Sequence, residues 1–464
     1  ALVENTTGAQ NTAVGQAALT TNTTGAGNVG VGRESLQYNT TGDNNVAVGE
    51  QALKQNTTAD NNIAVGDFAL NANTTGAANV AVGKDALKSN TTASNNTAVG
   101  YQSQESTTTG ANNTSTGLHA LRLNTTGSNN AALGFLALSA NTTANNNSAL
   151  GYSALSANTT GTQNVAVGAA ALDANTTADN NTALGYASLS ANTTGSANVA
   201  IGSIALDANT TGSNNTAVGY ASLSANTTGT QNVALGKSAG AAITTGIRNT
   251  TVGAASLDAE VAGNYNTAMG YGALSVQSNA SSTNVYNTAF GYLAGAAVTT
   301  GIQNTFIGSN SGDGTDDGGF NTGVGYNTLS ANCGNQNSAL GENALAQTTG
   351  ATNTAIGAAA GYEVTSGNNN IFLGTDAGRT GSPSGSITLQ SNQLGLGDEN
   401  ITNAYIQVDW TVASDQRDKT DFTALDLGLD FVKALAPVTY KWDKRSKYGD
   451  KSAADYDLAA QTPD

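Results

Sequence analysis

The sequence predicts an all-β chain whose main part is a parallel β-solenoid, and three observations carry that prediction. An Asn-x-x-x-Gly motif occurs 22 times at a nearly constant interval, so one structural unit is copied along the chain. Each copy contains a short segment with period-two alternation, which is typical of a strand. Each copy also has a turn sequence, most often Asn-Thr-Thr-Gly. The usual interval is seventeen residues, which suffice for two short strands and two turns, or one coil of a β-solenoid.

The glycine that closes the motif, called the motif glycine below, sets the register of about 22 predicted coils. From Gly15 to Gly270 the interval never varies, and Asn stands four positions before each motif glycine. Coils of a solenoid lie about 4.8 Å apart, so identical Asn side chains can bridge one another along the axis. The structural ladder predicted from this register is represented by Asn45, Gly49, Asn62, Gly66, Asn198 and Gly202.

Each predicted strand has two apolar or β-branched positions that flank a small residue. The residue before the motif glycine is apolar in every coil but that of Thr116, and this alternation predicts a strand with one buried face. The central residue is usually Ala, as at Ala47. Its side chain is compatible with close packing around a threefold axis and equally with exposure to water. A second short strand is expected around the Leu four residues after the motif glycine, called the repeat Leu below, as at Leu53 and Leu172.

Three coils exchange apolar volume between two positions. The repeat Leu is replaced by Gly, and the Asn three residues later becomes apolar. This exchange predicts that both positions face one interior, where packed volume must be kept. The pairs are Gly240 with Ile243, Gly295 with Val298, and Gly361 with Val364.

Composition excludes several classes of function. With one His and one Cys in 464 residues, no metal site or cofactor is expected. Residues 1–413 hold 8 basic and 22 acidic groups, a net charge of −14, whereas a nucleic-acid-binding shaft needs the opposite sign. No stretch of about 18 apolar residues occurs, so membrane insertion is not expected. Proline would remove hydrogen bonds between coils, and residues 1–382 contain none.

The strand motif resembles the head-domain repeats of trimeric autotransporter adhesins. The strings that carry the resemblance are Asn45–Gly49 (Asn-Val-Ala-Val-Gly) and Asn198–Gly202 (Asn-Val-Ala-Ile-Gly). Repeats of that family are shorter than the repeat of this chain and build a left-handed parallel β-roll that functions as a trimer. The resemblance therefore implies a left-handed, homotrimeric solenoid over residues 1–378.

The chain changes character after the repeats. Residues 379–413 are expected to form a β-rich neck with short strands at 387–389 and 405–408. Residues 414–464 hold 8 of the 16 basic residues, and residues 424–435 have apolar side chains at helical spacing. We therefore expect a small α+β module at 414–464.

Two segments of this module, 414–419 (Ser-Asp-Gln-Arg-Asp-Lys) and 435–442 (Leu-Ala-Pro-Val-Thr-Tyr-Lys-Trp), resemble a known domain. They are similar to the start of the endosialidase-type intramolecular chaperone domain at the C-termini of phage tail spikes and tail fibres. In that family the domain directs assembly of a trimeric β-rich shaft and is released by self-cleavage. The resemblance implies Ser414 as nucleophile and Lys419 as its base. Apart from this single turnover, the chain is not expected to be an enzyme.

These features together predict a structural and adhesive fibre protein, a phage tail fibre in the virion that attaches to a host surface. Its expected partners are two further copies of itself, other tail or baseplate proteins, and a glycan or protein receptor on the host. The alternative is a bacterial cell-surface adhesin or extracellular filament. An ice-binding solenoid ranks lower because Asn-Thr-Thr-Gly falls at a turn. A polysaccharide-degrading enzyme also ranks lower, because the coils offer no recurring pair of carboxylates.

A row of aromatic residues directly follows the motif glycine in eight coils. Three of them, Tyr152, Tyr186 and Tyr220, recur at every second coil. Exposed tyrosines can stack on sugar rings, so this row is a candidate glycan-contact stripe. Packing of partly exposed side chains along the rod is the alternative.

Overall fold

The computed structural model describes residues 1–405, which include one compact unit, Ala1–Thr402. The described part of the chain contains 25 strands and no helix. The helix predicted at 424–435 and the module at 414–464 lie outside the described residues, as does the strand predicted at 405–408 apart from its first residue. The bounds of the strands are β1 Thr12–Val14, β2 Val29–Val31, β3 Val46–Val48, β4 Ile63–Val65, β5 Val80–Val82, β6 Thr97–Val99, β7 Thr114–Thr116, β8 Ala131–Leu133, β9 Ser148–Leu150, β10 Val165–Val167, β11 Thr182–Leu184, β12 Val199–Ile201, β13 Thr216–Val218, β14 Val233–Leu235, β15 Thr250–Val252, β16 Gly263–Asn264, β17 Thr267–Met269, β18 Thr283–Asn284, β19 Thr288–Phe290, β20 Thr305–Ile307, β21 Thr322–Val324, β22 Ser338–Leu340, β23 Thr354–Ile356, β24 Ile371–Leu373 and β25 Leu394–Leu396.

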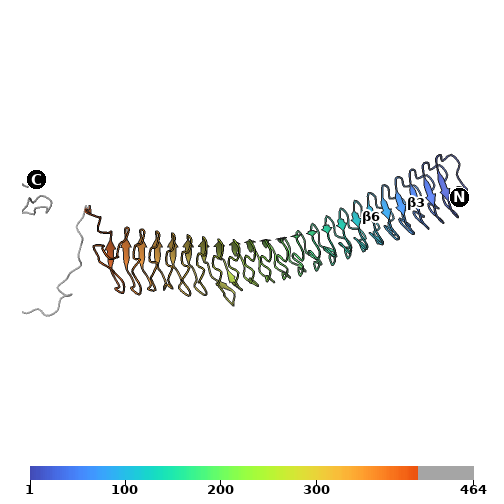
Figure 1. The fold of residues 1–464 in the computed structure, drawn as a ribbon. Helices are drawn as coiled ribbons and strands as arrows, with labels where there is room; N and C mark the ends of the chain where they lie inside the picture. Colours follow the sequence, from blue (N-terminus) through green and yellow to red (C-terminus); the bar gives the residue numbers. More distant parts are fainter. Residues whose placement is uncertain (406–464) are drawn as a thin grey trace, which may run out of the picture. The chain divides into compact units, whose positions relative to one another are not determined.

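One parallel sheet of 23 strands runs the length of this unit (Figure 1). Each coil contributes one three-residue strand, and each strand pairs in register with the strand of the next coil. Between β3 and β4, for example, Val46 pairs with Ile63 and Val48 with Val65. The predicted all-β parallel solenoid and the length of its repeat are confirmed, since paired residues are one sequence repeat apart.

The prediction of a second strand around the repeat Leu is wrong. Leu53 has φ 51° and Leu172 has φ 54°, and the residue two positions before each Leu is also left-handed. Such residues cannot continue a strand, so this side of the coil is a series of turns. Backbone hydrogen bonds still join the coils there, since the Leu53 N–H donates to the Ala69 carbonyl at 2.9 Å. The left-handed Leu side chains are buried, so tertiary packing outweighs the local cost of a positive φ.

The motif glycine is required by both its φ and its neighbours. Gly49 has φ 133° and Gly66 has φ 131°, a region that residues with a side chain rarely adopt. A Cβ on Gly66 would lie 2.6 Å from the Gly83 carbonyl, because the glycines stack directly on one another. Side chains are therefore excluded at this corner of every coil.

Two ladders of buried Asn run along the interior. In the first, the Asn62 N–H donates to Asn45 Oδ1 at 3.0 Å, and the Asn198 N–H does the same to Asn181 Oδ1. In the second, built by Asn-Thr-Thr-Gly, Asn39 Nδ2 donates to Asn22 Oδ1 at 2.8 Å. The side chains at both positions are fully buried, and each ladder supplies polar partners inside a thin solenoid that has little apolar core.

The central Ala of each strand faces the interior. Ala47, Ala64 and Ala200 are fully buried, whereas the flanking residues of the same strands are half-buried or exposed. The sequence predicted that the flanking residues form the buried face of the strand. In the single chain they form the outer face, so the side of the strand predicted to be buried is wrong. Ala fits the interior because the narrow coil leaves space for only one large side chain, the repeat Leu, opposite the strand.

The predicted exchange of apolar volume is confirmed, since Ile243, Val298 and Val364 are fully buried. The structure adds a second exchange that the sequence repeat did not reveal. Phe306 and Phe372 replace the central Ala and are fully buried, in coils where Gly takes the place of the repeat Leu. A Cβ on Gly312 would lie 2.4 Å from Phe306 Cε1, so the phenyl ring occupies the volume that Leu fills elsewhere.

One coil carries an insertion that is anchored by a buried carboxylate. Glu260 is fully buried, and its Oε1 accepts hydrogen bonds from the N–H groups of residues 261–263 and of Asn279. Its Oε2 accepts from Gln277 Nε2 at 2.7 Å and from Asn279 Nδ2 at 2.9 Å. These donors offset the cost of burying the carboxylate, and they hold the inserted loop beside the two-stranded sheet of β16 and β18.

The sheet continues past residue 378, where the sequence repeat ends. β25 pairs in parallel with β24, and Gln393 takes the place of the motif Asn. The prediction of a strand at 387–389 is wrong, because Ile387 instead buries its side chain in a non-strand segment.

Candidate functional site

The outer face of the sheet is formed by the first and third residues of each strand and is open to solvent. The third residue is apolar in every strand of this sheet but β7, whereas the first is Thr or Ser in 13 of the 23 strands. The strand-pairing register places equivalent residues in two continuous rows along the shaft. Leu133 is 49% exposed and Phe290 is 52% exposed. The exposed large apolar side chains of this face are Val14, Val48, Ile63, Val65, Val82, Leu133, Leu150, Val165, Leu184, Val233, Leu235, Phe290, Ile307, Leu340, Ile356, Ile371, Leu373, Leu394 and Leu396.

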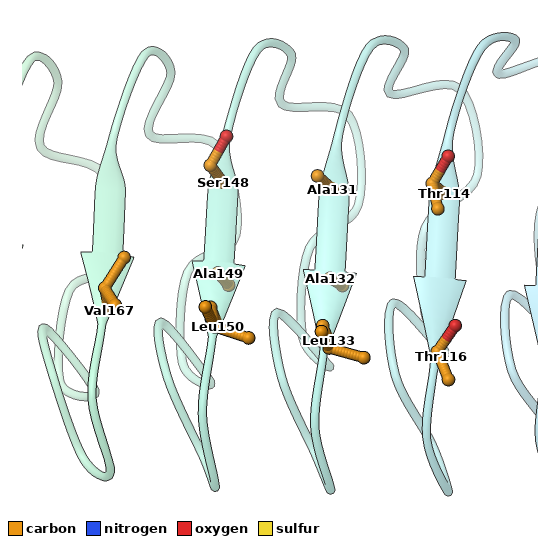
Figure 2. A pocket seen from close by; sticks show the side chains of 9 residues that line it. All are labelled: Thr114, Thr116, Ala131, Ala132, Leu133, Ser148, Ala149, Leu150 and Val167. Atoms are coloured by element: carbon orange, nitrogen blue, oxygen red, sulfur yellow. The ribbon is translucent and has the colours of Figure 1, made fainter.

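A shallow hollow of about 320 Å³ lies on this face over β7 to β10. It forms because Ala131 and Ser148 are smaller than the β-branched residues at the same position in neighbouring strands. Figure 2 shows the side chains of Leu133 and Leu150 on the same side of the sheet as those two small residues, with Ala132 turned to the other side. The hollow is therefore part of the outer face and is open to solvent in the single chain.

The residue directly after the motif glycine, called the rim position below, borders the outer face. The candidate glycan-contact residues Tyr152, Tyr186 and Tyr220 lie here and are 61%, 64% and 54% exposed. Aromatic rings on consecutive coils stack, since Phe135 and Tyr152 have ring centroids 5.4 Å apart and an interplanar angle of 8°. The structure thus brings the three tyrosines onto one exposed row, with one coil between each pair.

The rim position is charged in the first coils. Arg33 Nη1 lies 2.8 Å from Glu34 Oε1, and Arg33 also pairs with Glu50 of the next coil. Lys54 Nζ lies 2.7 Å from Glu34 Oε2. The hydrogen bond from Lys54 is the main cause that lowers the pKa of the Glu34 carboxyl. Arg33 and Glu50 are exposed, so their pair contributes little stability and marks the rim as a surface that faces water, whereas Glu34 and Lys54 are half-buried.

The fifth residue after the motif glycine, called the shoulder position below, carries Asp in four coils. Burial raises the pKa of each of these carboxyls above its usual range, because the charged form loses hydration. Oδ1 of Asp207 is buried and has no hydrogen-bond partner among the described residues. The sequence repeat alone did not single out these carboxyls, which are Asp173, Asp207, Asp258 and Asp313.

The Asn-Thr-Thr segments are structural in this fold. Asn22 and Asn39 are fully buried, so their amides are inaccessible in the folded chain. The first Thr of the segment donates its hydroxyl to the next coil, as Thr23 Oγ1 does to the Thr40 carbonyl at 3.0 Å.

Within residues 1–405 no group of three or more His, Cys, Asp or Glu side chains is arranged to hold a metal ion. Cys333 is buried and unpaired, and burial raises the pKa of its thiol. The described part of the chain has no helix that is long and apolar enough to cross a membrane.

Ser414 and Lys419, the residues implied in self-cleavage, lie outside the described residues. The family model for the chaperone of endosialidase matches residues 414–460. A comparison with curated proteins gave no significant match.

The fold and this match agree on a class of protein. The described part of the chain is a β-solenoid repeat protein, and residues 414–460 are similar to the chaperone of endosialidase. That combination is consistent with a structural protein of the tail fibre or tail spike type.

Proposed function

We propose that this chain forms the shaft of a phage tail fibre, which works as a homotrimer in the virion and attaches to a host surface. Its partners would be two further copies of itself, other tail or baseplate proteins, and a host receptor. The C-terminal domain would act as the assembly chaperone and be released by one self-cleavage beside Ser414.

The observation that carries this proposal is the exposed apolar outer face. In α/β proteins, helices cover both faces of an all-parallel sheet, and the strands are apolar on both sides. Here the central Ala residues form the inner face, while the third strand residues, such as Val65 and Leu150, leave a continuous apolar row uncovered on the outer face. Exposed apolar patches of more than a few hundred Å² mark interaction surfaces. A face that extends over 23 strands is far larger than that.

Copies of the same chain fit this face better than an unrelated partner does. The apolar row of third strand residues has the same spacing in every copy, so copies aligned coil by coil would match along the whole shaft. Closed rotational symmetry would let each chain present one and the same face to a common axis. The match of residues 414–460 to the chaperone of endosialidase supports the number three, because the resemblance to that family implies assembly of a trimeric shaft.

Charge substitutions on the outer face test this proposal. In the double variant Val65→Glu and Val82→Glu, six carboxylates would lie close together in a trimer, so we expect monomers by analytical ultracentrifugation. The matched control, Asp67→Lys, changes charge at the rim position between those strands and should leave the trimer intact. Trimers of the double variant, or dissociation of the control alone, would contradict the outer face as the interface.

A further inference from the structure

We propose that the shaft binds neutral pyranose units of a surface glycan in three ring slots along the rim. A ring slot is the gap between two exposed tyrosines at rim positions two coils apart. The coil between them has a small residue at its rim position. This inference rests on the proposed attachment function and gives it a ligand class and a place. The slots are Tyr152–Ala169–Tyr186, Tyr186–Ser203–Tyr220 and Tyr292–Ser309–Tyr326.

The walls of each slot are exposed aromatic rings. Tyr292 and Tyr326 are 53% and 52% exposed, similar to the tyrosines of the first two slots. Where aromatic rings occupy consecutive coils, they lie nearly parallel, with an interplanar angle of 13° between Tyr271 and Tyr292. Rings at this position can therefore stack on a ring of the adjacent coil, and the centroids of Tyr271 and Tyr292 are 5.7 Å apart.

The spacing of the walls suits a saturated ring. Coils about 4.8 Å apart place tyrosines of alternate coils about 10 Å apart. A planar aromatic ligand in contact with both walls needs only about 7–8 Å between them. A pyranose chair is thicker, because C–H groups project from both of its faces, and those C–H groups make favourable contacts with aromatic rings. Ala169, Ser203 and Ser309 leave the space between the walls open.

Every slot coil also carries a carboxylate. Ala169, Ser203 and Ser309 are each followed four residues later by Asp at the shoulder position. By contrast, Ser or Ala occupies the shoulder position in the six later coils that have Tyr at the rim, which are those of Tyr152, Tyr186, Tyr220, Tyr271, Tyr292 and Tyr326. The fourth shoulder Asp, in the coil of Ala254, likewise follows a small rim residue. The three slot carboxylates are Asp173, Asp207 and Asp313.

The shoulder is close enough to the rim to serve the same ligand. In the first coils, Arg33 at the rim pairs with Glu34, and Glu34 pairs with Lys54 at the shoulder of the next coil. Rim and shoulder side chains therefore share one surface. Asp173, Asp207 and Asp313 are half-buried, so each leaves part of its surface in solvent, and a carboxylate there can accept a hydrogen bond from a sugar hydroxyl.

The charge of the slots selects the class of glycan. Each slot has one carboxylate, and residues 1–413 carry a net charge of −14, so sialylated, uronic or phosphorylated glycans would be repelled. Neutral hexose units lack that penalty. The rim position is charged in other coils, at Arg33, Glu50 and Lys84, which indicates that it stays in water when the outer face is covered.

A glycan array with neutral and acidic oligosaccharides, probed with the full chain, tests the slots. We expect binding to neutral glycans and none to acidic ones. Tyr186→Ala removes a wall shared by two slots and should weaken the apparent affinity by about tenfold, because neighbouring slots act together. Tyr101→Ala is the matched control, since it removes a rim tyrosine that borders no slot.

A second variant fills the slots without removing any wall. Ala169→Tyr, Ser203→Tyr and Ser309→Tyr together would place a ring in each slot, as Phe135 and Tyr152 already stack on consecutive coils, and should abolish binding. Unchanged binding in this variant, no binding of neutral glycans by the unmodified chain, or preference for acidic glycans would overturn the proposal. Trimer formation is measured separately, so failure of the slots is distinguishable from failure of the proposed fibre.

Discussion

At the scale of single residues, the motif glycine has the strictest requirement in the coil. Gly66→Ala would place a Cβ 2.6 Å from the Gly83 carbonyl at φ 131°, so we expect it to destabilise the shaft by about 3 kcal/mol or more. Gly385→Ala is the control, because Gly385 has φ 69° but nothing within 4 Å of the added Cβ, and it should cost about 1 kcal/mol. Denaturant unfolding of both variants measures the difference, and equal losses would contradict the stacking explanation.

The shoulder carboxyls predict a pH dependence of stability. Burial raises the pKa of Asp173 and Asp207 in the folded chain above the unfolded value of 3.8. The folded state therefore favours the protonated form of each carboxyl. The resulting contribution to the free energy of unfolding is present below pH 3.8 and is lost as the pH rises through the folded pKa values. The double variant Asp173→Asn and Asp207→Asn should match the unmodified chain in melting temperature near pH 3 and exceed it near pH 7. If the melting temperature of the double variant exceeded that of the unmodified chain by less at pH 7 than at pH 3, the predicted direction of the pH dependence would be contradicted.

At the scale of elements, the repeat Leu and the central strand residue share one volume. Phe306→Ala should destabilise by about 3–5 kcal/mol, because it leaves a cavity beside Gly312. Adding Gly312→Leu restores the arrangement of the other coils and should recover most of that loss. Thermal unfolding of the single and double variants measures the recovery. A double variant no more stable than Phe306→Ala would show that the two positions do not share the space.

The register of the strands could be predicted from the sequence, but not which side of them is inside. Alternation shows that Val46 and Val48 share one face and Ala47 the other, and hydrophobicity then favours burial of Val. The interior is too narrow for Val opposite Leu53. This restriction depends on how the coil folds back on itself, so the alternation of residues along one strand cannot reveal it. The turns around Leu53 were missed for a similar reason, since Leu is rarely left-handed without tertiary support.

The candidate surfaces were predicted in part. The exposed row of Tyr152, Tyr186 and Tyr220 could be found from spacing alone, because every coil repeats the same position. The apolar outer face could not be found, since it depends on the inside–outside assignment. β25 was missed because Gln393 replaces the motif Asn and the last spacing is irregular.

At the scale of the whole molecule, self-cleavage makes a separate prediction. If Ser414 is the nucleophile and Lys419 accepts its proton, the expressed chain should be cut at Ser414, and Ser414→Ala should leave it intact. Ser452→Ala, which changes another Ser of the same matched region, is the control and should be cut normally. Denaturing gels and intact mass measure the products. Cleavage in Ser414→Ala would remove Ser414 from this role.

The central claim is that the apolar outer face is covered by copies of the same chain. Native mass spectrometry of the unmodified protein tests this claim most directly. We predict a complex of three chains, each of 46.1 kDa or shortened to its processed length. A chain that remains monomeric, with the outer face of all 23 strands open to water, would contradict it.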